Sequence, residues 1–274
     1  MQFAFLQSIP PSSFYPQDFK QIKGRAMKLS LQQCMVFVGS IGLAIPALAD
    51  QGNVQLGWVV SANTSYYQDV GDEFHQLPLI IAEYDQFYWQ AVRGGYRFFN
   101  GENHQVAVEV RRTFDGYESD DSSALAGMAR RYGAWEAGVA HEFGLLGGQL
   151  TTQIMQDVSV KHQGTSVRVN YERPLLIKPT YLVTWYTGAE HWDRDKTHYY
   201  FGVRPGEATA ARPAYRADSS HILIAGCNAV KQLSPRLLLL VSTEYQTFSG
   251  TVKESPLTER HDEWAAHGGI FYQF

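Results

Sequence analysis

The sequence predicts an all-β protein, an antiparallel transmembrane β-barrel of the bacterial outer membrane that follows a cleaved signal peptide. Three observations lead to this prediction. An export signal lies near the N-terminus, side chains alternate with a period of two from residue 53 onward, and the chain stops at an aromatic residue inside its last expected strand. The composition agrees, because 14% of the 274 residues are aromatic and 45% are hydrophobic, which excludes a disordered chain.

Residues 27–49 have the pattern of a secretory signal peptide. Lys28 supplies a short positive start, and Met35–Ile45 forms an apolar core of the length that such signals use. Ala47-Leu48-Ala49 is a small-x-small cleavage site. This segment therefore indicates export from the cytoplasm rather than a buried helix.

We expect cleavage between Ala49 and Asp50, so that the mature barrel covers residues 50–274. Residues 1–26 show no periodicity and are interpreted as a disordered lead or a misassigned start. Cys227 is then the single mature cysteine, so the mature fold has no intramolecular disulfide.

The charge of the mature chain argues against nucleic acid as a partner. The whole chain carries 23 basic and 27 acidic residues, and four of the basic residues but only one acid lie before Asp50. Nucleic-acid binding requires a basic face, which this acidic remainder lacks. No run of about 20 apolar residues follows Asp50, so no helix in that part is expected to span a bilayer.

Alternation with a period of two is clearest in four segments. Each has one mainly apolar wall and one more polar wall, because neighbouring side chains of a strand point to opposite faces. The segments are Gln105–Arg111, Ala134–Phe143, Ser166–Glu172 and Leu237–Phe248. A soluble sandwich would bury the apolar wall, whereas an outer-membrane barrel would turn it toward lipid. The export signal and the aromatic residues near strand ends favour the barrel, because interfacial girdles need aromatic side chains there.

The last strand carries the most specific local signal. Trp264, Ile270, Tyr272 and Phe274 share one face, and the chain ends on that face. The tail resembles the C-terminal signal that is read by the barrel assembly machinery of the outer membrane. The residues that we assign to this signal are His267, Gly269, Tyr272 and Phe274.

Counting back from a periplasmic C-terminus gives about 12 strands, with 10 as the alternative. Ten of them are expected at residues 53–63, 77–84, 104–113, 133–143, 149–159, 165–173, 179–191, 220–233, 236–248 and 263–274. Gln86–Phe99 is either one strand or a hairpin broken at Gly94-Gly95, and the even strand number of bacterial barrels favours the hairpin. The long irregular segments 114–132 and 193–218 are expected outside the cell.

The order of several short motifs resembles the MltA-interacting protein/OmpV family of outer-membrane barrels over about residues 53–274. The motifs that carry the resemblance are Leu77-Pro78-Leu79, Glu83-Tyr84-Asp85, Phe87-Tyr88, Ser119-Asp120-Asp121 before Arg130-Arg131, Tyr199-Tyr200-Phe201-Gly202-Val203, Pro213-Ala214-Tyr215, Leu233-Ser234-Pro235, Ser255-Pro256-Leu257 and Phe271-x-x-Phe274. Tyr66-Tyr67-Gln68-Asp69 departs from the Tyr-x-Gly-Ser-like turn that is usual in the family. The resemblance therefore does not predict the shape of the first loop.

This resemblance implies an outer-membrane protein that works as a scaffold, with a lytic murein transglycosylase and a penicillin-binding protein as partners. It equally allows a porin-like channel for small polar solutes, or a surface antigen or adhesin. Outer-membrane lipid, lipopolysaccharide and the barrel assembly machinery are the other partners expected of such a barrel. A scaffold would present its short periplasmic turns to the murein enzymes.

We expect neither an enzyme nor a cofactor. Ser242, Glu244 and His267 fall on the polar walls of adjoining strands and could meet, but a satisfied polar network explains them equally well. His191 and His198 flank two aspartates without the spacing of a metal site. Asp120-Asp121 could collect a divalent cation, although a solvated acidic loop is the simpler interpretation.

Charged residues on the polar walls are expected to line the lumen. They are Glu109, Arg111, Glu136, Glu142, Arg168, Glu172 and Glu244. Opposite charges on facing strands could pair and lock the barrel, or leave a narrow conducting path, because 12 strands enclose less space than a porin does. The sequence leaves both alternatives open.

Overall fold

The computed structural model describes residues 53–274. The predicted lead, the signal peptide and the Ala49/Asp50 cleavage site lie outside the described residues and stay predictions. Within residues 53–274, the chain forms a closed antiparallel barrel of 12 strands, in which each strand pairs with its sequence neighbours and β1 closes on β12. The predicted fold class and strand number are confirmed.

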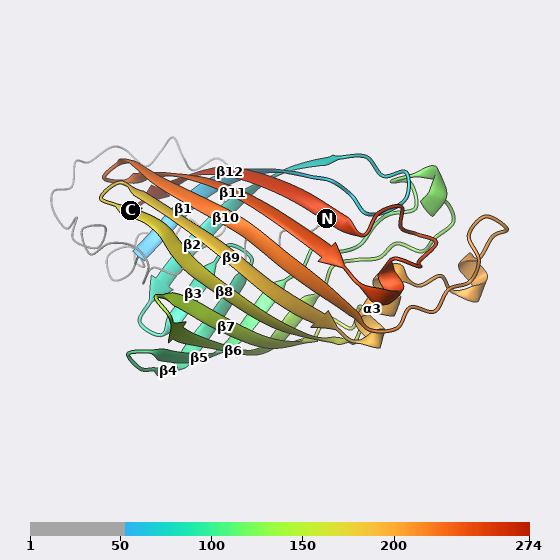
Figure 1. Ribbon diagram of the computed structural model, residues 1–274, viewed down its shortest axis with the longest axis horizontal. Helices are drawn as coiled ribbons and strands as arrows, with labels where there is room; N and C mark the ends of the chain where they lie inside the picture. Colours follow the sequence, from blue (N-terminus) through green and yellow to red (C-terminus); the bar gives the residue numbers. More distant parts are fainter. Residues whose placement is uncertain (1–52) are drawn as a thin grey trace.

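Most of the strands are long and tilted, and short connections join them at one end of the barrel (Figure 1). They are β1 (Asn53–Asn63), β2 (Glu73–Tyr84), β3 (Phe87–Gln90), β4 (Arg93–Asn100), β5 (His104–Arg112), β6 (Trp135–Leu145), β7 (Gly148–Asp157), β8 (Thr165–Lys178), β9 (Tyr181–Trp192), β10 (Ser220–Ser234), β11 (Leu237–Phe248) and β12 (Asp262–Gln273). The segment between β9 and β10 contains the helix α3 (Arg194–Phe201). Among residues 53–274, no helix is long and apolar enough to cross a membrane.

The two ends of the barrel differ in the length of their connections. At the turn end, which carries the C-terminus on the left of Figure 1, two to three residues join neighbouring strands. At the loop end on the right, long segments and α3 fold over the mouth of the barrel. Short turns on one side and long loops on the other are typical of outer-membrane barrels.

Several boundaries differ from the prediction, and β8 extends to Lys178 instead of ending at residue 173. The hairpin between β3 and β4 turns at Ala91 and Val92 rather than at Gly94-Gly95, and Ala91 adopts a left-handed φ of 59°. The two glycines instead lie within β4, where a Cβ would collide with Trp89 at Gly94 and with Tyr88 at Gly95. The glycine pair therefore indicates close packing and not a turn. The strand expected at 77–84 also begins earlier, at Glu73.

Alternation along each strand separates an outer apolar wall from an inner wall, as predicted. On β11, Val241 is exposed on the outside, whereas Ser242 and Glu244 are buried inside. β12 exposes Trp264 and Ile270 on its outer wall. This outward apolar wall is the one that faces lipid in a membrane barrel.

The interior has three layers. At the turn end lies an apolar cluster made of Val59, Leu79, Ala91, Val92, Leu182, Val230, Leu238, Leu240 and Phe271. At the loop end lies a second cluster, mostly aromatic, which includes Tyr66, Tyr67, Tyr117, Tyr186, Trp192, Tyr200, Phe201 and Phe248. Buried charged side chains fill the layer between them. The inner wall is thus not uniformly polar, because β11 turns Leu238 and Leu240 inward near the turn end.

Candidate functional site: a buried polar network across the lumen

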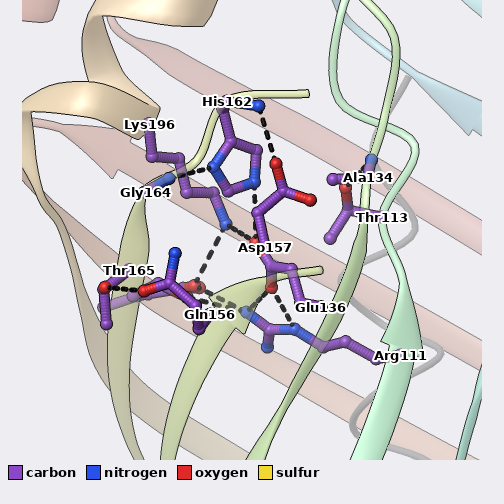
Figure 2. A network of polar contacts seen from close by, with 12 residues as sticks. Arg111, Thr113, Ala134, Glu136, Gln156, Asp157, His162, Gly164, Thr165 and Lys196 are labelled. Atoms are coloured by element: carbon purple, nitrogen blue, oxygen red, sulfur yellow. Dashed lines mark hydrogen bonds and ion pairs between the residues drawn. The ribbon is translucent and has the colours of Figure 1, made fainter. Parts of the chain in front are cut away.

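The middle layer is centred on an ion pair between neighbouring strands. Arg111 on β5 contacts Glu136 on β6, with 2.6 Å between Nη2 and Oε2, and Nε donates to the same oxygen at 2.7 Å (Figure 2). The side chains are 1% and 0% exposed. Because Arg111 and Glu136 are opposite each other in the β5–β6 register, alternation places both side chains inside the barrel.

Arg111 also reaches strands that are not its neighbours. Its Nη2 donates to Ser166 Oγ on β8 at 2.9 Å and to Glu190 Oε1 on β9 at 3.2 Å. Glu190 in turn pairs with Arg168 Nη2 at 2.8 Å. Since β5 and β9 are four strands apart in the barrel order, this guanidinium bridges the lumen from wall to wall.

Helix α3 supplies a further cation to the same network. Lys196 Nζ lies 2.6 Å from Glu136 Oε1 and 4.0 Å from Glu190 Oε1, and it sits 4.4 Å above the Trp192 ring. The Asp193 side chain caps α3 by accepting the Lys196 N–H at 3.0 Å, which fixes the first turn of the helix at the mouth of the barrel. The predicted external segment 193–218 therefore also enters the lumen.

His162 completes the environment of Glu136. Its Nδ1 accepts the Gly164 N–H at 3.0 Å, so the proton of a neutral ring resides on Nε2, which lies 3.2 Å from Glu136 Oε1. Asp157 accepts the His162 backbone N–H (Figure 2). It also accepts the N–H groups of Lys161 and Gln163 and so holds the loop that presents this ring. Glu136 thus accepts hydrogen bonds from three elements, which offsets the cost of burying its charge.

Two tyrosines each cross one neighbouring strand on the inner wall and reach a glutamate on the strand beyond it. Tyr186 on β9 passes over Gly226 on β10 and donates to Glu244 Oε2 on β11 at 2.8 Å. Tyr88 on β3 passes over Gly95 on β4 and donates to Glu109 Oε2 on β5, also at 2.8 Å. In both places the middle strand carries a glycine because a Cβ there would overlap the tyrosine ring.

Glu172, which was also predicted to line the lumen, has neutral partners. Thr184 Oγ1 donates to its Oε1 at 2.6 Å, and Asn228 Nδ2 approaches it at 3.5 Å. Of the seven side chains expected in the lumen, the structure brings Arg111, Glu136 and Arg168 into one network with Glu190. It leaves Glu109, Glu172 and Glu244 in separate hydrogen-bonded pairs or groups. Glu142 accepts a hydrogen bond from Gln149 Nε2 at 2.9 Å.

Sequence reasoning missed three members of the network. Glu190 follows the alternation of its strand and could have been found by extending the polar wall of 179–191 to its end. Lys196 and His162 lie in connections, and no period-two signal marks a loop side chain that folds back into the lumen.

The residues of the expected assembly signal lie on both walls of β12. His267 is buried and opposite Ser242, whereas Tyr272 and Phe274 are exposed on the outer wall with ring centroids 5.2 Å apart. Gly269 lies beneath the Phe271 and Val59 side chains. These positions describe the strand and do not test recognition by the assembly machinery.

The groups considered for catalysis and metal binding have other contacts. Ser242 Oγ donates to Asn228 Oδ1 at 2.7 Å, and Glu244 accepts from Tyr186. Asp121 Oδ2 accepts the Glu118 N–H at 2.7 Å in an exposed loop. Among residues 53–274, no three His, Cys, Asp or Glu side chains gather at one point that could hold a metal ion.

Comparison with known proteins gives a family and several relatives. The family model described as "MltA-interacting protein MipA" matches residues 56–274. The outer membrane protein Omp26La of Vibrio anguillarum and the outer membrane protein OmpV of Vibrio cholerae are each 26% identical over 181 residues, which cover 65% of this chain and 70% of the relative. Among solved structures, the translocator domain of the autotransporter NalP from Neisseria meningitidis is 9% identical, with a TM-score of 0.43, over 85% of this chain and 94% of that one.

Proposed function

Given that this chain belongs to the MltA-interacting protein MipA family and is an outer-membrane β-barrel, we propose that it is a closed scaffold for murein hydrolase and synthase assembly. The name of the family supports a contact with a lytic murein transglycosylase. The observation that carries the proposal is the filled lumen. Arg111 joins β5 to β9 across the interior, and apolar clusters lie on both sides of the polar layer.

A filled lumen disfavours free passage of solutes. The charged side chains that would line a pore have ion-pair or hydrogen-bond partners in the lumen. Arg111 and Glu136 are at most 1% exposed. An open porin leaves a water-filled channel through its centre, and such charged groups would then face water. The porin-like alternative requires α3 and its Lys196 to leave the lumen first.

The turn end offers a surface for a protein partner. The β8–β9 hairpin exposes Leu175, Leu176 and Ile177. The register shifts between Pro174 and Leu176, so Ile177 is opposite the buried Leu182 and lies on the inner wall. The 53% exposure of Ile177 on the inner wall indicates that this hairpin extends past the rim of the barrel. Exposed apolar side chains on a small surface suit a transient contact, and we place the murein enzyme there.

Two measurements test the proposal. Purified full-length barrel should give no steady conductance in planar bilayers and should capture a lytic murein transglycosylase from solution. The variant Ile177→Asp (53% exposed) should weaken this capture, whereas Leu233→Asp, at a similarly exposed site in β10 beside the β10–β11 turn (46%), should not. Steady conductance without any capture would replace the scaffold by the porin-like function.

A further inference from the structure

Two histidines meet on the outer wall of the barrel near the loop end. His191 on β9 and His221 on β10 are register partners, and their Nδ1 atoms lie 3.3 Å apart. The ring centroids are separated by 4.7 Å, with 39° between the planes. In the sequence His191 stands near His198, but the sheet pairs it with a residue 30 positions later.

The backbone geometry keeps these two rings close. The His221 carbonyl accepts the Ser249 N–H at 2.9 Å, so the hydrogen-bonding groups of His221 point toward β11 and away from β9. His191 and His221 are therefore a non-hydrogen-bonded pair, the type in which facing side chains of an antiparallel sheet approach most closely. Two paired strands thus hold both imidazoles, and no loop residue is needed to bring them together.

We propose that His191 and His221 bind a divalent transition-metal ion, with zinc as the best fit. Two imidazole nitrogens at the usual Zn–N distance in a tetrahedral site lie roughly 3.3 Å apart, which is the separation found here. Neutral imidazole is a ligand that zinc, copper and nickel prefer, whereas magnesium and calcium select oxygen. Water fills the other coordination positions.

The position of the pair makes it accessible from outside the cell. The aromatic pair Tyr245 and Trp264 lies on the outer wall of β11 and β12, and aromatic girdles on this wall mark the membrane interface. Tyr245 is opposite Ala225 on β10. His221 lies four residues beyond Ala225, about 13 Å further along the strand toward the loop end. An ion can therefore reach the imidazoles from water.

The pair also stands at the base of the segment that closes the lumen. β9 ends at Trp192 and β10 begins at Ser220, so His191 and His221 flank the connection that contains α3 and Lys196. A bound ion would join the two strands where this connection leaves the barrel. Metal binding should therefore stabilise the folded barrel in addition to occupying the site.

A second histidine pair provides an internal control. His104 Nδ1 and His141 Nε2 are also 3.3 Å apart, but they lie diagonally on β5 and β6. Their rings are nearly parallel at 5°, and His104 also stacks on Phe143 at 4.6 Å. Ring lone pairs lie in the ring plane, so this parallel arrangement favours a hydrogen bond between the rings over chelation.

The test is a zinc titration of the full-length chain, purified without a histidine tag and folded in detergent micelles. We expect one ion per chain by isothermal titration calorimetry, and a rise of the melting temperature with zinc concentration. Since even outer-shell partners change metal affinity about 10–100-fold, His191→Ala and His221→Ala should each weaken binding by at least about tenfold. Both variants should also lose the zinc-dependent rise in melting temperature, while His104→Ala keeps both effects.

Three results would overturn the proposal. They are the absence of saturable zinc binding by the folded wild-type chain, unchanged affinity in both His191→Ala and His221→Ala, and an equal loss in His104→Ala. Heat-modifiable migration on gels shows whether each variant is folded, and both residues lie on the outer surface, where truncation to alanine creates no cavity. The scaffold function and the metal site can fail independently, because the titration involves no murein enzyme.

Discussion

Arg111 and Glu136 form an ion pair of 2.6 Å that is almost completely removed from water. Arg130 and Glu118 form an ion pair of the same length in an outer loop, where the side chains are 50% and 43% exposed. The two pairs share their chemistry and distance and differ in burial. They therefore allow the contribution of the lumen network to be measured against a surface pair in the same protein.

Glu136→Gln should destabilise the barrel strongly. The change leaves Arg111, Lys196 and Arg168 with Glu190 as the remaining carboxylate of the cluster. Loss of one partner of a buried ion pair costs about 3–5 kcal/mol, because the other charge stays buried without compensation. Equilibrium unfolding by guanidinium chloride in micelles measures the change. Glu118→Gln, which removes the exposed pair, should cost at most about 1 kcal/mol, and equal losses in the two variants would contradict the prediction.

Gly226→Ala should break the bridge between Tyr186 and Glu244. The new methyl group overlaps the Tyr186 ring and the Thr243 carbonyl oxygen, so the ring must move away from the carboxylate 2.8 Å from its hydroxyl. Tyr186→Phe is the matched control, because it removes the hydroxyl and keeps the ring. We expect Gly226→Ala to lower the unfolding midpoint more than Tyr186→Phe does. If the two variants have the same midpoint, the glycine is not required for the crossing.

Stability should depend on pH through Glu207 at the loop end. Burial acts to raise the pKa of Glu207, but hydrogen bonds from Arg131 and from the N–H groups of Arg204 and Ala129 outweigh it and lower the pKa below its ordinary value of 4.5. The folded state therefore holds this proton less tightly than the unfolded state. The stabilisation is complete above pH 4.5 and is lost as the pH falls through the lower pKa of the folded state.

Glu207→Gln isolates this contribution from that of other carboxyl groups. At neutral pH the variant should unfold more easily by about 1.5–3 kcal/mol, the usual value of a hydrogen bond to a charged group. Below pH 4.5 the difference between variant and wild type should shrink, as measured by guanidinium unfolding over a series of pH values. A difference that stays constant across the series would show that the charge of Glu207 does not stabilise the fold.

Deletion of Phe274 should impair insertion into the outer membrane. The residue is exposed on the outer wall beside Tyr272, and its N–H donates to the Val54 carbonyl oxygen at 3.1 Å where the barrel closes. We expect the truncated chain to accumulate in the periplasm, as judged by fractionation and heat-modifiable migration. Phe274→Tyr keeps an aromatic end and should insert normally. Normal insertion of the truncated chain would argue against an assembly signal at this residue.

The sequence determined the architecture because alternation is a local property. Each residue of a strand lies on the face opposite to its neighbours, so Glu109, Arg168 and Glu244 could be assigned to one wall without knowledge of their partners. The export signal and the aromatic residues near strand ends then favoured a barrel whose apolar wall faces lipid. The family resemblance also followed from motifs whose order is visible along the chain.

Tertiary structure alone decided which of these groups meet. Arg111 Nη2 lies 3.2 Å from Glu190 Oε1 because barrel closure turns the inner faces of strands four positions apart toward each other. Helix α3 folds inward and places Lys196 beside Glu136. His191 meets His221 only through the β9–β10 register. Partners across a lumen depend on barrel closure, strand tilt and loop packing, which are properties of the whole chain, so local periodicity contains no record of them.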